Sequence, residues 1–418
     1  MRCLPMAENP KIAPWLTIAG IGEDGIAGLG DEAKRRIAEA ELVCGGKRHL
    51  ELADSLITGE RHQWLSPIEH SVELVNAARG RNVCVLASGD PFFFGMGATL
   101  SRTIDPSEMF VIPAPSSFSL AASRLGWPLQ DLALVSLHGR PLDLIRPHLQ
   151  PGARILALTS DETGPSQLAA LLAGNGFGQS GLIVLEALGG GNERVTKHVA
   201  ARFSQEVVSP LNICAIEVVA GEGARILPLA SGLDDGLFEH DGQITKREIR
   251  AVTLSTLAPR KGELLWDIGG GSGSIAIEWM LAHPAMCAIA IEADAERAER
   301  IARNARAFGV PGLHVVTGSA PSALNDLARP DAIFVGGGGS DPGVMDAAMS
   351  ALGPGGRLVA NGVTLEMEAV LLGLQARHGG ALIRIDISRA GPVGSMQGWR
   401  PAMPVTQWSW VKALKDRS

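Results

Sequence analysis

The sequence lacks the cysteine and histidine patterns that mark disulfide-rich and metal-binding proteins. Its cysteines are odd in number and form no Cys-x-x-Cys pair, so we predict small buried thiols in a reducing cytosol. The ten histidines show no metal-ligand spacing, and we therefore predict no metal cofactor. The cysteines are Cys3, Cys44, Cys84, Cys214 and Cys287.

Signals for membranes and export are missing as well. No apolar run reaches the length of a membrane span. Residues 1–14 lack the basic, apolar and cleavage regions of a signal peptide. We therefore expect a cytoplasmic protein with no membrane partner.

The chain also has little charge of either sign. Charged residues make up 19% of the sequence and the net charge is −7 at pH 7, so nothing globally basic indicates a nucleic-acid partner. With 418 residues, of which 46% are hydrophobic, the natural expectation is two domains with separate cores.

What the chain does have is a glycine cluster behind an apolar segment. Residues 264–268 read Leu-Leu-Trp-Asp-Ile, and four of the next five residues are glycines. Apolar residues then repeat at helical spacing from Ile275 to Met280. A strand, a glycine turn and a helix N-terminus together present unpaired backbone N–H groups and the positive end of a helix dipole to a ligand.

The spacing of these glycines narrows the class of ligand. The order is Asp267-x-Gly269-x-Gly271-x-Gly273, and Ser274 stands where a dinucleotide fingerprint has its third glycine or alanine. Glu292 ends the next apolar run, where an acid can bind both hydroxyls of a ribose. This pattern resembles the S-adenosylmethionine (SAM) site of Rossmann-like methyltransferases. A nicotinamide oxidoreductase and a glycine turn without a ligand remain alternatives.

Strands and helices alternate through the first half, which predicts an α/β fold. Glycine turns follow several of the predicted strands. The predicted strands are 15–22, 42–46, 82–88, 109–112, 132–137, 153–158, 182–185 and 213–219, and the predicted helices are 29–42, 67–79, 118–125 and 165–173.

Small and polar residues interrupt the pattern at 221–242. We therefore predict a linker at 223–241 between domains at 14–222 and 242–418. A second α/β series follows, with strands near residues 263, 286, 313, 331, 356, 381 and 405.

Capping residues predict two helices of the second half. Thr245 and Glu248 have the spacing of a capping box for a helix that ends near Leu257. Asp294 is the predicted N-cap of a helix at 295–308. Pairs at i,i+4, Glu296 with Arg300 and Glu299 with Arg303, would support the second helix.

The first half resembles the tetrapyrrole (corrin/porphyrin) methylase family, whose fold has two α/β subdomains. The matching segments are Ile-Ala-Gly-Ile-Gly at 18–22, Ala-Ser-Gly-Asp-Pro-Phe-Phe-Phe-Gly at 87–95, Pro-Ser-Ser at 115–117, and the segments 137–140, 188–193 and 210–212. The first glycine turn of this family usually contains a proline, whereas Glu23 and Asp24 follow Gly22 here.

The second half resembles the decarboxylating methyltransferase of the same pathway, a Rossmann-like domain with a mostly parallel sheet. The matching segments are the glycine cluster and residues 242–248, 318–321, 330–338 and 355–361. The two resemblances cover nearly the whole chain in order.

Together the resemblances imply a bifunctional enzyme of cobalamin biosynthesis. The implied substrate is precorrin-6B, a polycarboxylate tetrapyrrole, which would be methylated at meso carbons 5 and 15 and would lose the ring C acetate carboxyl as CO2, giving precorrin-8X. The N-terminal domain would methylate carbon 5, and the C-terminal domain would decarboxylate and methylate carbon 15. A homo-oligomer formed through the C-terminal domain is also expected.

The resemblance implies one SAM site in each half. The expected cofactor contacts in the first half are Gly20, Gly22, Gly89, Asp90, Pro91, Ser116 and Ser117. The expected contacts in the second half are Thr245, Asp267, Gly269, Gly270, Gly271, Ser272, Gly273, Glu292, Ser319 and Ala320.

An acidic protein that binds many carboxylates needs guanidinium groups in its cleft. We predict that Arg140, Arg357 and Arg389 bind substrate, with Arg384, Arg400, Lys246 and Arg247 as further candidates.

Methyl transfer from SAM is an in-line displacement, so alignment of the reactants supplies much of the rate. An enamine-like meso carbon needs no strong protein base, and we find no signature of a catalytic triad and name no catalytic residue. Two further alternatives are a pair of methyltransferase domains that act on another small substrate, and a non-catalytic scaffold or cofactor sensor with one degenerate half.

Overall fold

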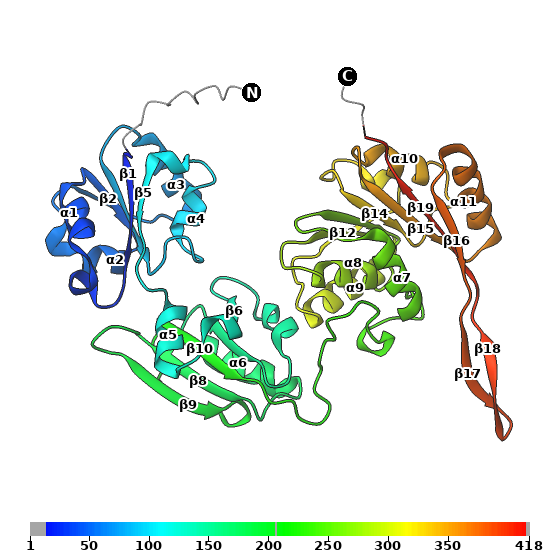
Figure 1. Cartoon of the computed structure of the whole chain (residues 1–418), viewed down its shortest axis with the longest axis horizontal. Coiled ribbons are helices and arrows are strands. Elements are labelled where there is room, and N and C mark those ends of the chain that lie inside the picture. The colour runs from blue at the N-terminus through cyan, green and yellow to red at the C-terminus, as the bar shows by residue number, and fades with distance from the viewer. Residues whose placement is uncertain (1–13, 205–206, 415–418) are drawn as a thin grey trace, which may run out of the picture. The chain divides into compact units, whose positions relative to one another are not determined.

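The chain folds into α/β layers in both halves, as the alternation of strands and helices predicts (Figure 1). The structure is a computed structural model that describes residues 14–204 and 207–414. It divides into two units. Unit 1 runs to Arg140 and includes Gln150–Arg225, and unit 2 contains Pro141–Leu149 and the chain from Ile226 onward.

The first sheet of unit 1 is entirely parallel, in the order β3-β2-β4-β1-β5. Parallel strands are buried on both faces, and β1, β2 and β4 accordingly consist almost wholly of buried apolar residues. The strands are β1 Leu16–Ile21, β2 Leu42–Gly45, β3 Glu60–Gln63, β4 Val83–Ser88 and β5 Met109–Ile112, and the helices are α1 Asp31–Glu39, α2 Lys47–Leu52, α3 Ile68–Ala77 and α4 Met96–Leu100.

The second sheet of unit 1 is mixed, in the order β6-β7-β10-β8-β9. Only β6 and β7 pair in parallel. Its strands are β6 Ala133–Ser136, β7 Arg154–Leu158, β8 Gly181–Glu186, β9 Arg194–Val199 and β10 Asn212–Glu217, with helices α5 Ser117–Leu125 and α6 Gly164–Gly174. The two sheets correspond to the two expected subdomains.

Unit 2 has one seven-stranded sheet in the order β13-β12-β11-β14-β15-β19-β16, in which only β19 runs antiparallel to its neighbours. The order reverses between β11 and β14, which is where open α/β sheets bind ligands. The strands are β11 Leu264–Ile268, β12 Cys287–Glu292, β13 His314–Thr317, β14 Ala332–Val335, β15 Arg357–Gly362, β16 Ala381–Ile385 and β19 Val405–Val411. The helices are α7 Arg247–Leu257, α8 Ser274–Leu281, α9 Ala295–Ala307, α10 Val344–Ala351 and α11 Leu365–His378.

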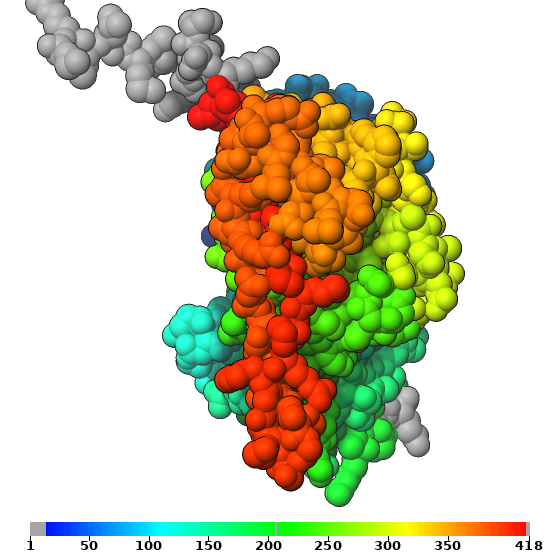
Figure 2. Space-filling model, turned by 90° about the vertical axis from the view of Figure 1, so that its right-hand side faces the viewer, coloured from blue at the N-terminus to red at the C-terminus, as the bar shows by residue number. Residues whose placement is uncertain are grey.

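A two-stranded hairpin, β17 Ser388–Val393 with β18 Met396–Pro401, projects beyond this sheet (Figures 1 and 2). Met396 and Trp399 are exposed over more than 70% of their surface. The hairpin is not predicted from the sequence, because its residues include Gly391, Pro392 and Gly394, which are typical of a loop.

The segment 226–241, most of the expected linker, packs against unit 2. Leu227, Leu233 and Phe238 are buried in the same core cluster as helices α7 and α8. The backbone N–H groups of Gly232 and Leu233 donate to the buried Glu278 carboxylate at 2.6 and 3.0 Å. We call residues 226–241 the strap.

A buried arginine joins the strap to α7 and α8. Arg250 has no exposed surface, and its Nε donates to Glu278 at 2.5 Å while Nη1 donates to Asp235 at 3.2 Å. Its guanidinium also lies 4.8 Å from the centre of the Phe238 ring. A buried charge is tolerated only when it is paired and hydrogen-bonded, so this arginine depends on the strap.

Two local predictions are wrong. Lys246 is the N-cap of α7, and no side chain caps it, so the Thr245 and Glu248 capping box does not form. Cys287 is exposed, unlike the buried Cys44, Cys84 and Cys214, because it starts β12 at the edge of the core. The prediction for Cys3 lies outside the described residues.

Candidate functional site

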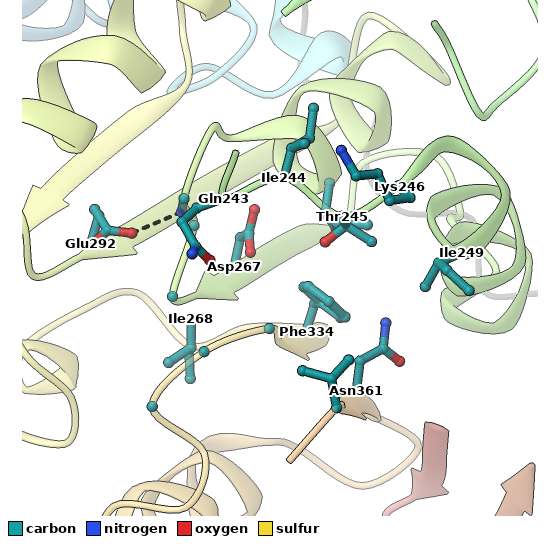
Figure 3. A pocket seen from close by; sticks show the side chains of 18 of the residues that line it. Gln243, Ile244, Thr245, Lys246, Ile249, Asp267, Ile268, Glu292, Phe334 and Asn361 are labelled. Carbon is teal, nitrogen blue, oxygen red and sulfur yellow. Dashed lines mark hydrogen bonds between the residues drawn. The ribbon is translucent and has the colours of Figure 1, made fainter. Parts of the chain in front are cut away.

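A cavity of about 610 Å³ opens at the carboxyl ends of the central strands of unit 2 (Figure 3). That volume lies in the range of small-molecule sites. Its walls come from the loops that follow β11, β12, β13 and β14, from the end of β15, and from residues near the start of α7. Of the predicted cofactor contacts, it is lined by Thr245, Asp267, Gly269, Gly270, Gly271, Glu292, Ser319 and Ala320.

The glycine loop has the backbone conformation that its sequence predicts. Gly269, Gly271 and Gly273 have φ values of +74°, +59° and +77°, which side chains other than glycine rarely adopt. A Cβ added to Gly269 or Gly273 would collide with other parts of the protein. A Cβ on Gly269 would lie 2.6 Å from the backbone of Gly337, and one on Gly273 would lie 2.8 Å from Ile301. These glycines therefore let the loop pack tightly, and the backbone of Gly269–Gly271 lines the cavity.

Asp267 supplies a buried carboxylate beneath this loop. Its Oδ2 accepts the Ala276 N–H at 3.1 Å, and its Oδ1 has no hydrogen-bond partner in the described part of the chain. Burial raises the pKa of Asp267 to about 7, opposed by the Ala276 hydrogen bond and reinforced by the charge of Glu292. An unpartnered buried acceptor that lines a cavity is a strong point of attachment for a cation or a donor.

Glu292 ties the end of β12 to the glycine loop. Its Oε2 accepts the Gly271 N–H at 2.8 Å (Figure 3). Its Oε1 accepts the Asp294 N–H at 3.0 Å. Asp294 in turn caps α9 by accepting the Arg297 N–H at 3.0 Å, which confirms the predicted N-cap. The carboxylate is thus held at the cavity edge in a fixed orientation.

Two predicted contacts do not line the cavity. Gly273 packs against Ile301. Ser272 is buried, and its carbonyl accepts the Asn304 amide at 2.9 Å. Both residues lie in the glycine loop but serve its attachment to α9.

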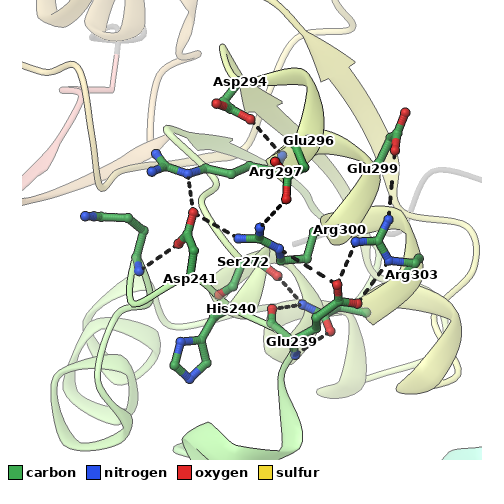
Figure 4. A network of polar contacts seen from close by, with 12 residues as sticks. Glu239, His240, Asp241, Ser272, Asp294, Glu296, Arg297, Glu299, Arg300 and Arg303 are labelled. Atoms are coloured by element: carbon green, nitrogen blue, oxygen red, sulfur yellow. Dashed lines mark hydrogen bonds and ion pairs between the residues drawn. The ribbon is translucent and has the colours of Figure 1, made fainter.

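A network of ion pairs fixes the end of the strap against α9 (Figure 4). Asp241 pairs with Arg297 at 2.9 Å and with Arg300 at 3.0 Å, and Glu239 pairs with Arg303 at 2.6 Å. Hydrogen bonds from the Gln243 N–H, Arg297 and Arg300 hold the pKa of Asp241 far below its usual range. The predicted i,i+4 pairs of α9 are also present, Glu296 with Arg300 at 3.1 Å and Glu299 with Arg303 at 3.9 Å.

The predicted substrate arginines separate into different roles. Arg389 lines the cavity and pairs with Glu248. The prediction that Arg357 lies in the cleft is wrong. Arg357 starts β15 at the amino edge of the sheet, opposite the cavity. Its guanidinium is buried and donates to Glu263, at 2.9 Å from Nη1, and to the Leu257 carbonyl at 2.6 Å.

Of the remaining candidate substrate-binding side chains, only Lys246 lines the cavity. Arg384 pairs with Glu368 at 2.8 Å and Arg400 donates to the Pro392 carbonyl at 2.6 Å. Lys246 lines the cavity, 3.7 Å from Asp235, and Arg247 pairs with Asp234 at 3.8 Å.

The predicted contacts of the first half gather at the carboxyl edge of the parallel sheet of unit 1. The Gly89 N–H donates to Ile21 at 3.2 Å, and the Gly89 carbonyl accepts the Ala114 N–H at 3.2 Å. A Cβ on Gly20 would lie 2.0 Å from the Gly89 carbonyl oxygen. The loops after β1, β4 and β5 therefore form one interlocked edge that only glycine permits.

Several of these side chains have local structural partners. Asp90 Oδ1 accepts the Phe92 N–H at 2.9 Å, which shapes the turn around the buried Pro91. Ser116 caps α5 by accepting the Ser119 N–H at 3.1 Å, and Ser117 is the first residue of that helix.

The loop that lacks the family proline still turns. The Gly25 N–H donates to the Gly22 carbonyl at 3.0 Å. Glu23 pairs with Arg48, and a Cβ on Gly190 would lie 2.8 Å from that of Glu23. The loop is therefore closed by hydrogen bonding and packed against the glycine segment 189–191.

Exposed aromatic residues follow this edge. Phe92, Phe93 and Phe94 are each exposed over at least 37% of their surface, and Phe94 has a φ of +57°, a strained conformation typical of functional loops. Arg140 is exposed, with its guanidinium 6.0 Å from the centre of the Phe94 ring.

Sequence reasoning missed the wall of the cavity opposite the glycine loop. Asn361 ends the segment 355–361, which resembles the decarboxylating methyltransferase, but that resemblance predicts no role for it. The apolar residues of this wall are Ile249, Val363, Ile385, Ile387, Ala402, Met403 and Val405. Asn361 could have been found from its place near the carboxyl end of a predicted strand.

The cavity fits the cofactor that the resemblance implies. The unpartnered Asp267 Oδ1 suits a positively charged group, and the fixed Glu292 suits a ribose. Within residues 14–204 and 207–414, no three His, Cys, Asp or Glu side chains gather as metal ligands. Over the same residues, no helix is both long enough and apolar enough to cross a lipid bilayer.

Comparison with known proteins matches each half to a family. Residues 16–203 match the Tetrapyrrole (Corrin/Porphyrin) Methylases, and residues 236–412 match the Precorrin methyltransferase domain. Two shorter relatives from Salmonella typhimurium align with parts of the chain. Cobalt-precorrin-7 C(5)-methyltransferase is 30% identical over 43% of this chain and 88% of its own. Cobalt-precorrin-6B C(15)-methyltransferase (decarboxylating) is 32% identical over 39% of this chain and 85% of its own.

One relative aligns over almost the full length. Precorrin-6Y C(5,15)-methyltransferase [decarboxylating] of Sinorhizobium sp is 72% identical over 406 residues, which are 97% of this chain and 98% of that protein. The chain therefore belongs to the family of decarboxylating precorrin-6Y C(5,15)-methyltransferases.

Proposed function

We propose that the chain converts precorrin-6B to precorrin-8X with two molecules of SAM, and that its two units divide the work. Residues 14–222 would methylate carbon 5, and residues 242–418 would remove the ring C acetate carboxyl and methylate carbon 15. The observation that carries the proposal is the cavity of unit 2, where Asp267 and Glu292 meet the glycine loop at the switch point of the sheet. The two Salmonella typhimurium relatives, named for one of these steps each, support the division.

SAM would supply an electrophilic methyl group, and the residues of the cavity would hold it in line with the substrate carbon. Asp267 would face the positively charged part of the cofactor, Glu292 would bind the ribose, and Ser319 and Ala320 would lie beside the adenine. The wall formed by Ile249, Val363, Ile385, Ile387 and Val405 would exclude water around the substrate. Positioning and desolvation then provide the catalysis, and no general base is required of the protein.

In unit 1, the interlocked edge formed by Gly20, Gly89 and the start of α5 would hold the second SAM. Arg140, beside Phe94, would bind a carboxylate of the macrocycle. Arg389 would do the same at the rim of the cavity in unit 2.

Two glycine substitutions test whether the two units catalyse different steps. Gly20→Ala would place a Cβ 2.0 Å from the Gly89 oxygen, and Gly269→Ala would place one 2.6 Å from Gly337. With precorrin-6B and SAM, mass spectrometry should show two added methyl groups and one lost CO2 for the wild type. Gly20→Ala should give one methyl and CO2 loss, whereas Gly269→Ala should give no CO2 loss. Loss of CO2 in Gly269→Ala, or no product from the wild type, would contradict the proposal.

A further inference from the structure

The cavity of unit 2 has two unlike sides. The residues expected to hold SAM follow β11, β12 and β13. Asn361 lies near the end of β15, two strands away from β11 on the other side of the switch point, which is about 10 Å at the usual strand spacing. Most of its neighbours along that wall are aliphatic, so its amide is a polar group set in a largely apolar wall.

Hydrogen bonds from two other elements fix the Asn361 amide. Its Nδ2 donates to Thr253 Oγ1 on α7 at 3.0 Å, and its Oδ1 accepts Gln407 Nε2 on β19 at 2.9 Å. Gln407 is buried, and its Nε2 also donates to Thr253 at 3.1 Å. A network with this many partners holds a side chain in one orientation.

The orientation of the amide follows from counting protons. The single hydroxyl proton of Thr253 goes to the Ile249 carbonyl at 2.8 Å, so Thr253 Oγ1 can only accept from Asn361 and Gln407. The amide nitrogens of both residues must therefore face Thr253. This leaves Asn361 one N–H without a partner among the described residues, and its nitrogen points into the cavity (Figure 3).

We propose that Asn361 donates this N–H to a carboxylate oxygen of the tetrapyrrole, and that Gln407 and Thr253 are the positioning residues that aim it. The inference rests on the proposed function, since it names a substrate contact in the same cavity. The substrate class carries many acceptor oxygens, and the amide offers a donor at the wall away from the cofactor residues. A neutral donor orients a carboxylate and holds it less tightly than an arginine would.

The test compares Asn361→Ala and Asn361→Asp in the full chain, with Asn325→Asp as the matched control on an exposed asparagine of the same unit. For Asn361→Ala, kcat/KM for precorrin-6B should fall about ten- to a hundredfold, the usual range for a hydrogen bond to a charged group. Asn361→Asp should be slower still, because it presents a carboxylate to a carboxylate. Calorimetric affinity for SAM should stay within about twofold of the wild type in both, which also reports that the cavity is folded.

Gln407→Leu, alone and combined with Asn361→Ala, tests whether Gln407 acts by orienting the Asn361 amide. If Gln407 acts by aiming Asn361, the double variant should be no slower than Asn361→Ala alone, whereas independent roles would multiply their effects. Unchanged kcat/KM in Asn361→Ala would overturn the inference, and so would a loss of SAM affinity that accounts for the whole effect. A wild type that makes no product from precorrin-6B would overturn the proposed function, and this inference with it.

Discussion

Binding of SAM in unit 2 should release a proton from Asp267 near neutral pH. Burial raises the pKa of this carboxyl to about 7 in the free protein. A unit positive charge 4 Å away, at an effective dielectric constant of about 20, favours the carboxylate by about 4 kcal/mol, or about three pKa units. The pKa of Asp267 in the bound form would then lie well below that in the free form.

The sign of the pH effect follows from these two values. Below pH 7 the free carboxyl holds a proton that it must lose when the cation binds, so affinity rises with pH until the free carboxyl is ionised. About 0.9 proton should leave per cavity at pH 6 and about 0.1 at pH 8, and the dissociation constant at pH 6 should be about tenfold larger than at pH 8.

Calorimetry in two buffers with different ionisation enthalpies measures this proton directly. Asp267→Asn keeps the shape and an acceptor for the Ala276 N–H but cannot ionise, so its proton release and pH dependence in unit 2 should vanish. Asp346→Asn, an exposed carboxyl on α10, is the matched control and should behave like the wild type. Equal proton release at pH 6 and pH 8, or the same release from Asp267→Asn, would refute the reasoning.

Three further expectations concern other residues. Glu292→Gln should weaken SAM binding about tenfold and move its pH midpoint downward, because the Glu292 charge contributes to the raised pKa of Asp267; calorimetry over pH checks both, and an unmoved midpoint counts against the coupling. Arg357→Ala should destabilise unit 2 by about 3 kcal/mol, because the largely buried Glu263 loses its ion-pair partner; urea unfolding measures this, and a raised KM with full stability would restore Arg357 as a substrate residue. Trp399→Ser with Met396→Ser should lower the mass seen by light scattering if the expected homo-oligomer of the C-terminal domain forms through its exposed hairpin; an unchanged mass would exclude that interface.

Strand ends were the most informative signal in the sequence. Asp267 lies next to the carboxyl end of its apolar run and Glu292 closes its own, and parallel strands bring such ends to one edge of a sheet. The same rule explains the error at Arg357, which begins its strand and so lies at the opposite edge. Asn361, four residues later, is at the correct end of that strand, and its role depends on Thr253 and Gln407, which are distant in sequence.

The hairpin and the strap were missed for a different reason. Both are rich in glycine, proline and small polar residues, which typify loops. Their structure comes from pairing with another segment, β17 with β18 and the strap with α7, α8 and α9. The local residue pattern of one segment does not show which other segment it will pack against.

The strap decides where the two halves can be cut apart. A fragment that began at Gly242 would leave vacant the places of Leu227, Leu233 and Phe238. It would also remove the Asp235 and Leu233 acceptors of Arg250 and the two backbone donors of Glu278. Proteolysis or gene fission that yields an intact decarboxylating half should therefore cleave before Ile226. Residues 226–241 therefore belong to the same folded unit as the glycine cluster and its cavity.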